Sequence, residues 1–185
     1  IEDPIEHHLR GALQRQVGLH SHGFARALKT AQAGDFDVVA LSAIPDAPTL
    51  RQALELALSG CLVLAGVCAG GAQRALEQLL ELPTPAHRAV LRGLLAQALG
   101  GIIAQRLVRQ AEGRGRLIAA EVLLATPGIA ALIREDRLGG LRGQALRERA
   151  AGMHFLDESL LTLVQRGAVT PAEARAQLQI PGALE

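Results

Sequence analysis

The chain has 185 residues, 49% of them apolar, with three Phe, no Trp or Tyr, and a formal net charge of +1. This length fits one domain with at most a small appended lobe, and it is enough to bury a core. The balanced charge and the scarcity of aromatic side chains argue against a nucleic-acid partner. No continuous apolar stretch reaches the roughly 18 residues that a membrane helix needs, and no signal peptide is visible, so we expect a cytoplasmic protein.

Strand and helix patterns alternate in the first half of the chain. Ser21 and Thr49 are the candidate N-caps of two helices, and Gly60 ends the second of them. The apolar runs are of the kind that forms a parallel sheet covered on both faces. The alternation predicts an α/β fold with a mostly parallel sheet and flanking helices. In chain order we expect a helix over 24–31, a strand over 37–41, a helix over 50–57, a strand over 61–67 and a helix over 72–82.

The second half changes to a hairpin and short helices. Thr170 followed by Pro171, with Glu173 at the capping-box position, is a strong start signal for the last helix. We predict one domain with an α/β core over 1–124 and a small helical C-terminal lobe over 125–185. The expected elements are a helix over 90–99, hairpin strands over 102–108 and 116–124, and helices over 127–134, 142–150, 155–166 and 171–178.

Four segments carry a family resemblance: IEDPIEHH, QRQVGLHSHGFARALKTA, TPGIAALIRED and GMHFLDESLLTLVQRGAVTPAEA. In this order they resemble the Asp box, the segment before the Walker B strand, the C-terminal helix motif and the closing helices of the PilT-like type IV pilus retraction ATPases, a group of the type II/IV secretion ATPase superfamily. The resemblance spans nearly the whole chain. It implies the C-terminal part of a RecA-like P-loop NTPase core, with ATP and Mg²⁺ as cofactors.

The same resemblance implies partners and a place of action. A PilT-like protein is a subunit of a ring, normally a hexamer, and works in twitching motility. It acts in the cytoplasm, peripheral to the inner membrane at the pilus base, against an inner-membrane platform protein. We therefore expect a homo-hexameric or hetero-hexameric ring for this chain.

The residues that would handle ATP depart from the family pattern. Phosphoryl transfer needs a phosphate-binding loop, a carboxylate that fixes magnesium and a group that positions water. No GxxxxGK[ST] loop occurs in these residues, and in the family it lies upstream of the Asp box. Where the family carries Gly-Glu after the Walker B strand stand Ser42 and Ala43, and the Arg-Asp pair that follows appears as Pro45 and Asp46. Cys68 replaces the His-box histidine.

Three functions stay open on this pattern. The preferred one is a hydrolysis-deficient pseudo-ATPase, which acts as a motor subunit or regulates pilus retraction, alone or beside an active PilT-type paralogue in one ring. The second is an active but slow retraction ATPase whose Walker A loop lies upstream. The third is a scaffold domain of a pilus or secretion machine that does not bind nucleotide.

The remaining candidates for a nucleotide-edge site are acidic residues of the first segment and one arginine. Glu2, Asp3 and Glu6 either orient water or magnesium, or end a strand and line a subunit interface. Arg15 matches an arginine of the family segment and is a candidate contact to a neighbouring subunit's nucleotide.

The histidines and the cysteines suggest no further chemistry. The His-x-His pair of His20 and His22 suits a zinc or nickel site, but no cysteine or fixed carboxylate completes a ligand set, so we predict no metal site. Cys61 and Cys68 lack metal-type spacing. Cys68 lies on an apolar run with no cation beside it in sequence, so we expect a buried thiol that packs as a small apolar side chain.

Overall fold

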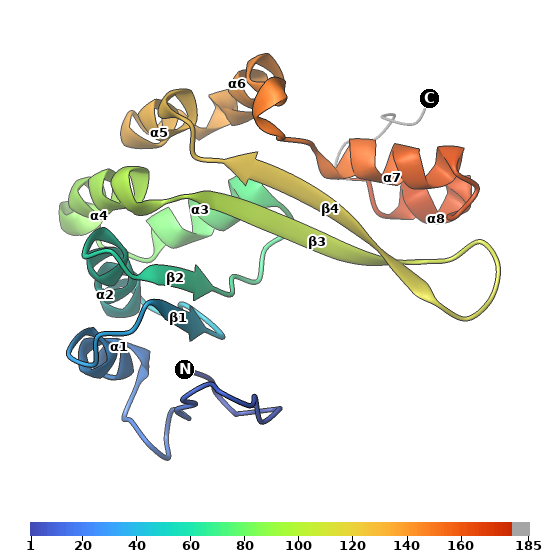
Figure 1. The fold of residues 1–185 in the computed structure, drawn as a ribbon. Coiled ribbons are helices and arrows are strands. Elements are labelled where there is room, and N and C mark those ends of the chain that lie inside the picture. Colours follow the sequence, from blue (N-terminus) through green and yellow to red (C-terminus); the bar gives the residue numbers. More distant parts are fainter. Residues whose placement is uncertain (179–185) are drawn as a thin grey trace. The chain divides into compact units, whose positions relative to one another are not determined.

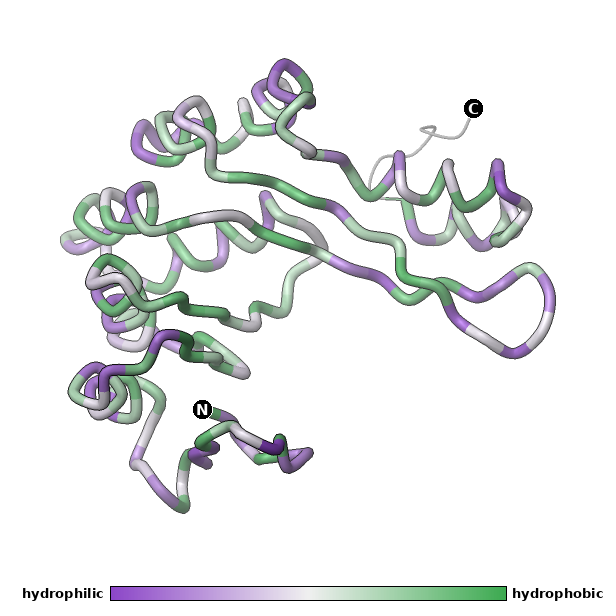
Figure 2. The backbone as a smooth tube through the Cα atoms, in the orientation of Figure 1, coloured by the Kyte–Doolittle hydropathy of each residue, from purple (hydrophilic) through white to green (hydrophobic). Residues whose placement is uncertain are grey.

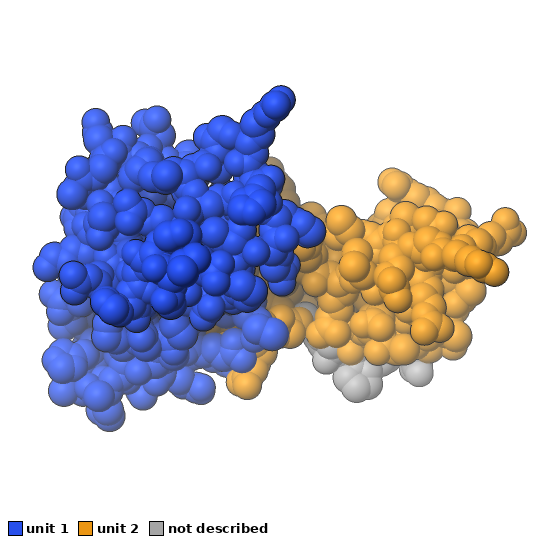
Figure 3. Space-filling model, turned by 90° about the horizontal axis from the view of Figure 1, so that it is seen from below, with its two compact units in different colours: residues 1–68, 77–98 blue, residues 69–76, 99–185 orange. Residues whose placement is uncertain are grey.

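The structure is a computed structural model that describes residues 1–178. It divides into two compact units, coloured separately in Figure 3. Unit 1 comprises residues 1–68 and 77–98, and unit 2 comprises residues 69–76 and the described residues from 99 onward. The division crosses the chain at residues 68/69, 76/77 and 98/99, and the helical lobe expected after residue 124 stays a prediction. The hairpin belongs to unit 2 because its apolar side chains pack with those of the last helices.

Unit 1 is an α/β unit built on parallel strands, as predicted (Figure 1). Strands β1 and β2 pair in parallel from Val38 opposite Leu62 to Leu41 opposite Ala65. The C-terminal part of α3 lies in unit 1 and its N-terminal part in unit 2. The elements are α1 (Phe24–Gln32), β1 (Val38–Leu41), α2 (Ala47–Leu58), β2 (Leu62–Ala65), α3 (Ala72–Glu81) and α4 (Pro85–Ala98).

The two faces of this sheet have different surroundings. Val39 and Leu41 point into a core formed with α1 and α2, whose buried members include Phe24, Leu28, Ala53 and Leu56. The alternate residues of both strands are open: the exposed fractions are 52% for Val38, 56% for Leu62 and 53% for Leu64. The trace of these strands is nonetheless strongly apolar (Figure 2). The expectation of cover on both faces is therefore wrong within residues 1–178, because α1 and α2 bury only the Val39 face.

Two helix starts in unit 1 differ from the prediction. The N-cap of α1 is Gly23, which makes no side-chain cap, and the Ser21 hydroxyl donates instead to the Gly23 carbonyl at 3.1 Å. The N-cap of α2 is Asp46, whose carboxylate accepts from the Thr49 amide at 2.8 Å. Thr49 is the third helical residue and is 1% exposed. Asp46, which occupies the acidic position of the family's Arg-Asp pair, thus serves the helix start in this chain.

Helix α4 begins earlier than expected, at Pro85. Proline is favoured at the first position of a helix because its missing N–H would have no helical partner there. The Thr84 carbonyl accepts from the amides of His87 and Arg88 at 2.9 and 3.1 Å. The helix expected over 90–99 leaves this proline outside, although it marks the first turn.

Unit 2 is an antiparallel hairpin with short helices. The predicted hairpin is confirmed, with Gly101 opposite Leu124 and Arg109 opposite Arg116. Its core joins Val108 and Ala119 to Leu156, Leu160 and Val169. The elements are β3 (Gly101–Arg109), β4 (Arg116–Leu124), α5 (Pro127–Arg134), η1 (Leu138–Gly140), α6 (Leu141–Arg147), η2 (Arg149–Ala151), α7 (Leu156–Gln165) and α8 (Pro171–Ala176).

Two carboxylates tie the helices of unit 2 to its hairpin. The Thr170 cap of α8 is confirmed, since its hydroxyl accepts from the Glu173 amide at 3.2 Å. The Glu173 carboxylate, however, accepts from the Arg109 amide of β3 at 3.1 Å. Glu121 of β4, 6% exposed, accepts from the Ala72 amide at the start of α3 at 3.3 Å.

None of the helices among residues 1–178 has the length and the apolar character that a membrane span requires.

Candidate functional site

The first residues of the chain extend the sheet of unit 1. The Ile1 nitrogen donates to the Ala40 carbonyl at 2.7 Å, and the Ser42 amide donates to the Ile1 carbonyl at 3.0 Å. Glu2 forms a parallel bridge with Gln16 on its other side. Glu2 therefore lies at the carboxyl end of its short strand, beside the end of β1. In open parallel sheets, ligands bind outside this edge.

The acidic candidates of this segment differ in their surroundings. The half-buried Glu2 carboxylate accepts from the Gln14 side-chain amide at 2.8 Å. Gln14 also donates to the His7 carbonyl at 2.8 Å and accepts from the Leu9 amide at 2.7 Å, so one glutamine organises the loop. Asp3 and Glu6 are exposed.

Arg15 takes part in the same pairing through its backbone. Its carbonyl accepts from the Glu2 amide at 3.0 Å, and its side chain is half-buried. The structure thus brings Arg15 beside Glu2 at the sheet edge, while its expected role toward a neighbouring subunit stays a prediction.

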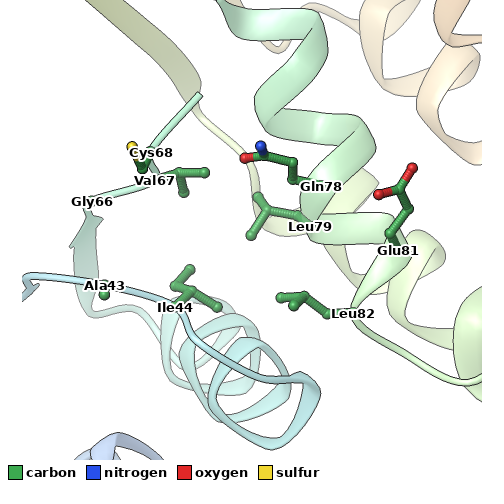
Figure 4. Close-up of a pocket in the computed structure, with 9 residues that line it drawn as sticks. All are labelled: Ala43, Ile44, Gly66, Val67, Cys68, Gln78, Leu79, Glu81 and Leu82. Atoms are coloured by element: carbon green, nitrogen blue, oxygen red, sulfur yellow. The ribbon is translucent and has the colours of Figure 1, made fainter. Parts of the chain in front are cut away.

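A hollow of about 440 Å³ lies beyond the ends of β1 and β2 (Figure 4). Ala43 and Ile44 follow β1, and Gly66, Val67 and Cys68 follow β2. The opposite wall comes from α3 and the turn after it. Figure 4 shows the side chains of Ile44, Leu79 and Leu82 pointing toward one another across the hollow. The two degenerate positions named from sequence, Ala43 and Cys68, therefore line the same cavity.

The lining of this hollow does not fit the catalytic part of a magnesium-ATP site. Magnesium in such sites is held by oxygen ligands, usually carboxylates together with substrate phosphates. The strand ends present the methyl group of Ala43 and the thiol of Cys68, and neither is a magnesium ligand. Glu81 is the acidic member of the lining, and its carboxylate points away from the apolar side chains (Figure 4).

Gly66 sets how closely the two strand ends approach. Its amide donates to the Leu41 carbonyl at 2.9 Å. A Cβ built at Gly66 would collide with the Ser42 carbonyl oxygen and lie 3.2 Å from its carbon. A glycine at the end of a strand pattern is the sequence signal of such a close approach.

The expectation that Cys68 is buried is wrong. Strand β2 ends at Ala65, and Cys68 lies in the exposed segment after it. Cys61, at the start of the same apolar run, is half-buried. Burial raises the pKa of the Cys61 thiol, and the nearby Asp37 charge adds to this effect. The strand is therefore shorter than its apolar run, and the site-facing cysteine is the open one.

We expect a thiol reagent such as iodoacetamide to modify Cys68 faster than Cys61, by about tenfold or more at neutral pH. The raised pKa of Cys61 leaves less thiolate at any pH below it, and its partial burial limits access. Mass spectrometry of samples taken at successive times measures both rates. The Cys61→Ala and Cys68→Ala variants show which signal belongs to which cysteine. Faster labelling of Cys61 would contradict the exposed position of Cys68.

The histidines near this edge take part in local bonds. His20 Nδ1 accepts from the Gln16 amide at 2.9 Å. Among residues 1–178, no three His, Cys, Asp or Glu side chains gather as metal ligands would. Arg106, another arginine of the chain, donates to the Gly70 carbonyl at 3.3 Å and to the Gln177 side chain at 3.4 Å, both within unit 2.

Sequence reasoning missed two polar residues of the site, Gln14 and Gln78. Gln14 had no motif to mark it, because its role depends on the folding of a loop. Gln78 and Glu81 lie on the polar side of α3, next to the apolar Leu79 and Leu82 that face the hollow. Their helical spacing was visible, but the element that they would face was not.

Comparisons with known proteins find relatives over nearly the whole chain. The family described as type II/IV secretion system protein matches residues 1–121. The chain is 33% identical over 183 residues to a twitching motility protein of Neisseria gonorrhoeae, covering 97% of this chain and 49% of the relative. It is 32% identical to the type IV pilus retraction ATPase PilT of Pseudomonas aeruginosa, covering 98% of this chain and 54% of the relative. The chain thus spans about half the length of these curated relatives.

A solved structure shows the same fold. The crystal structure of the pilus retraction motor PilT with bound ADP superposes with a TM-score of 0.84 at 28% identity, over 97% of this chain and 51% of that one. The ATPase DotB of Legionella pneumophila shares the fold at 17% identity with a TM-score of 0.78, over 87% of this chain and 43% of that one.

Proposed function

This chain belongs to the type II/IV secretion system protein family, and we propose that it is the C-terminal part of a pilus retraction motor subunit that has lost ATP hydrolysis. Its likeness to PilT-type motors extends over nearly its full length. This extent supports the first part of the proposal, a subunit of a retraction motor. The second part of the proposal, the loss of ATP hydrolysis, is supported by the lining of the hollow beyond β1 and β2.

The observation that carries this step is the pairing of Ala43 and Cys68 in one cavity. A methyl group neither accepts a proton nor binds a water that holds magnesium. In the family pattern these positions carry a glutamate and a histidine. Because two separate strands each lost the expected group at the same cavity, the changes concern one chemical step.

The core residues around the cavity persist. Val39 and Leu41 of β1 stay buried in an intact core, and Asp46 caps α2. A chain that keeps the packing and loses the reactive groups retains a ring subunit's shape without its chemistry. We propose that it works in the cytoplasm at the pilus base, in a homo-hexameric ring or beside an active paralogue that supplies hydrolysis, against an inner-membrane platform protein.

The experiment is phosphate release from ATP by the longest natural form of this protein, with nucleotide binding measured on the same sample. We expect binding of ATP with magnesium and phosphate release at background. An active PilT-type motor assayed in parallel is the positive control. Release at a rate comparable to that control would overturn the proposal and favour an active ATPase.

A scaffold that does not bind nucleotide is the second candidate. The apolar lining favours it, since Ile44, Leu79 and Leu82 converge where polar ligands would be expected (Figure 4). Neither binding nor release in the same assay would support this alternative. The two candidates are thus separated by the binding measurement alone.

A further inference from the structure

A second hollow, of about 400 Å³, lies within unit 2 along one side of α7. Strand β4 contributes Ile118 to it, η2 contributes Arg149, and the segment between η2 and α7 contributes His154. From α7 and its C-cap come Glu158, Thr162 and Arg166, which are spaced by four residues and so lie on one face of the helix. The nucleotide chemistry discussed above uses none of these residues.

The hollow has more cationic groups than its own carboxylate can pair. Glu158 is the acidic member of the lining, and it already accepts from Arg149 at 3.0 Å and from the Phe155 amide at 3.3 Å. The Arg166 guanidinium is exposed and makes no ion pair with any residue that the structure describes. A guanidinium on the rim therefore stays available for an incoming anion.

The frame around these groups is held by backbone bonds. His154 pairs with Val122 of β4 in both directions, at 2.9 and 3.2 Å. The Ser159 hydroxyl accepts from the Ala120 amide at 3.1 Å, which joins α7 to β4. The backbone that carries these side chains is therefore ordered before binding, so that binding costs no ordering of the backbone.

One wall of the hollow is apolar and open. Ile118 is 58% exposed, although it lies within a paired strand, opposite Leu107. An exposed aliphatic group and an available guanidinium that line one hollow suit a peptide with an acidic and an aliphatic side chain, and they suit a small hydrated ion less well. A planar guanidinium matches a carboxylate through two parallel hydrogen bonds.

We propose that this hollow binds an acidic peptide segment of a partner protein, with a carboxylate on Arg166 and an aliphatic side chain on Ile118. Arg149 stays on Glu158 and adds to the positive field at the rim. The site belongs to unit 2 and operates whether or not the protein binds or hydrolyses ATP. It gives the subunit a contact for a partner of complementary negative charge.

The test uses the full chain and a fluorescein-labelled peptide of alternating Glu and Leu, with fluorescence anisotropy as the readout. We expect saturable binding that weakens with added salt, because the contact at the rim is electrostatic. Arg166→Gln should weaken it by about tenfold or more, the usual effect of losing a charged hydrogen bond. Arg175→Gln, which removes another exposed arginine of unit 2, is the matched control and should leave binding unchanged.

Three results would overturn the proposal. Equal loss of binding in Arg166→Gln and Arg175→Gln would mean attraction to overall charge only. Equal affinity for a peptide with Gln in place of Glu would remove the carboxylate from the interaction. Binding of inorganic phosphate without binding of the peptide would mean a small-ion site. Circular dichroism of both variants confirms that each one folds, and Ile118→Ser provides an independent test of the aliphatic contact.

Discussion

Replacing Ala43 by Glu in a Cys68→His background is expected to raise ATP turnover of the longest natural form by about 10²–10⁴-fold over Cys68→His alone. Ala43 follows β1 and faces the hollow that Cys68 also lines. A carboxylate there would lie at the carboxyl edge of the sheet, the position from which it can accept a proton from water. Phosphate release under saturating ATP measures the change.

The matched control for this experiment is Ala43→Gln in the same background. Glutamine has nearly the shape of glutamate but is not a proton acceptor at neutral pH, so turnover should stay at background. An equal gain with Gln would show that side-chain volume, and not a missing base, limits the reaction. Turnover in the natural protein that already equals the Glu variant would remove the basis of the hydrolysis-deficient reading.

Gly66→Ala is expected to destabilise the protein by about 1–3 kcal/mol, because the added Cβ meets backbone atoms that cannot rotate away. The colliding group is the Ser42 carbonyl, and Ser42 is itself bonded to Ile1. Relief of the contact requires the ends of β1 and β2 to separate, which also opens the hollow. Chemical denaturation followed by circular dichroism measures the free energy of unfolding.

Gly93→Ala is the control of opposite sign. Gly93 lies inside α4, and an added Cβ meets no atom within 4 Å. Alanine there removes the entropic cost of a helical glycine and should stabilise the protein by about 0.5–1 kcal/mol. If both glycine variants shifted stability in the same direction, the close approach of Gly66 to Ser42 would not be the cause.

The sheet of β1 and β2 shows what a sequence pattern can predict and what it cannot. The apolar run of each strand correctly predicted a strand, because only a pleated, largely apolar segment fits beside another in a parallel sheet. Periodicity does not say how many faces a neighbour covers. Val38, Leu62 and Leu64 are more than half exposed although they are as apolar as the buried Val39.

Helix caps show the same division. Thr170 before Pro171 was recognised from sequence, because a hydroxyl followed by proline is a local signal that no distant residue needs to complete. From the sequence, we assign Asp46 to the family's Arg-Asp pair and the cap of α2 to Thr49. In the structure Asp46 is the N-cap. The second role of Glu173, a bond to the amide of Arg109, joins residues far apart in sequence, and only the fold brings them together.

Residue identity and short-range pattern are enough to predict the alternation of strands and helices, the family, and the missing acid and imidazole at Ala43 and Cys68. The fold alone shows that the two altered positions line one hollow, that Cys68 is exposed, and that Arg166 and Ile118 line a second hollow beside α7. Each of these features is set by the residue at which a strand ends, or by the segments that pack against the edge of a sheet. Contacts between distant segments set those features, and local pattern does not encode them.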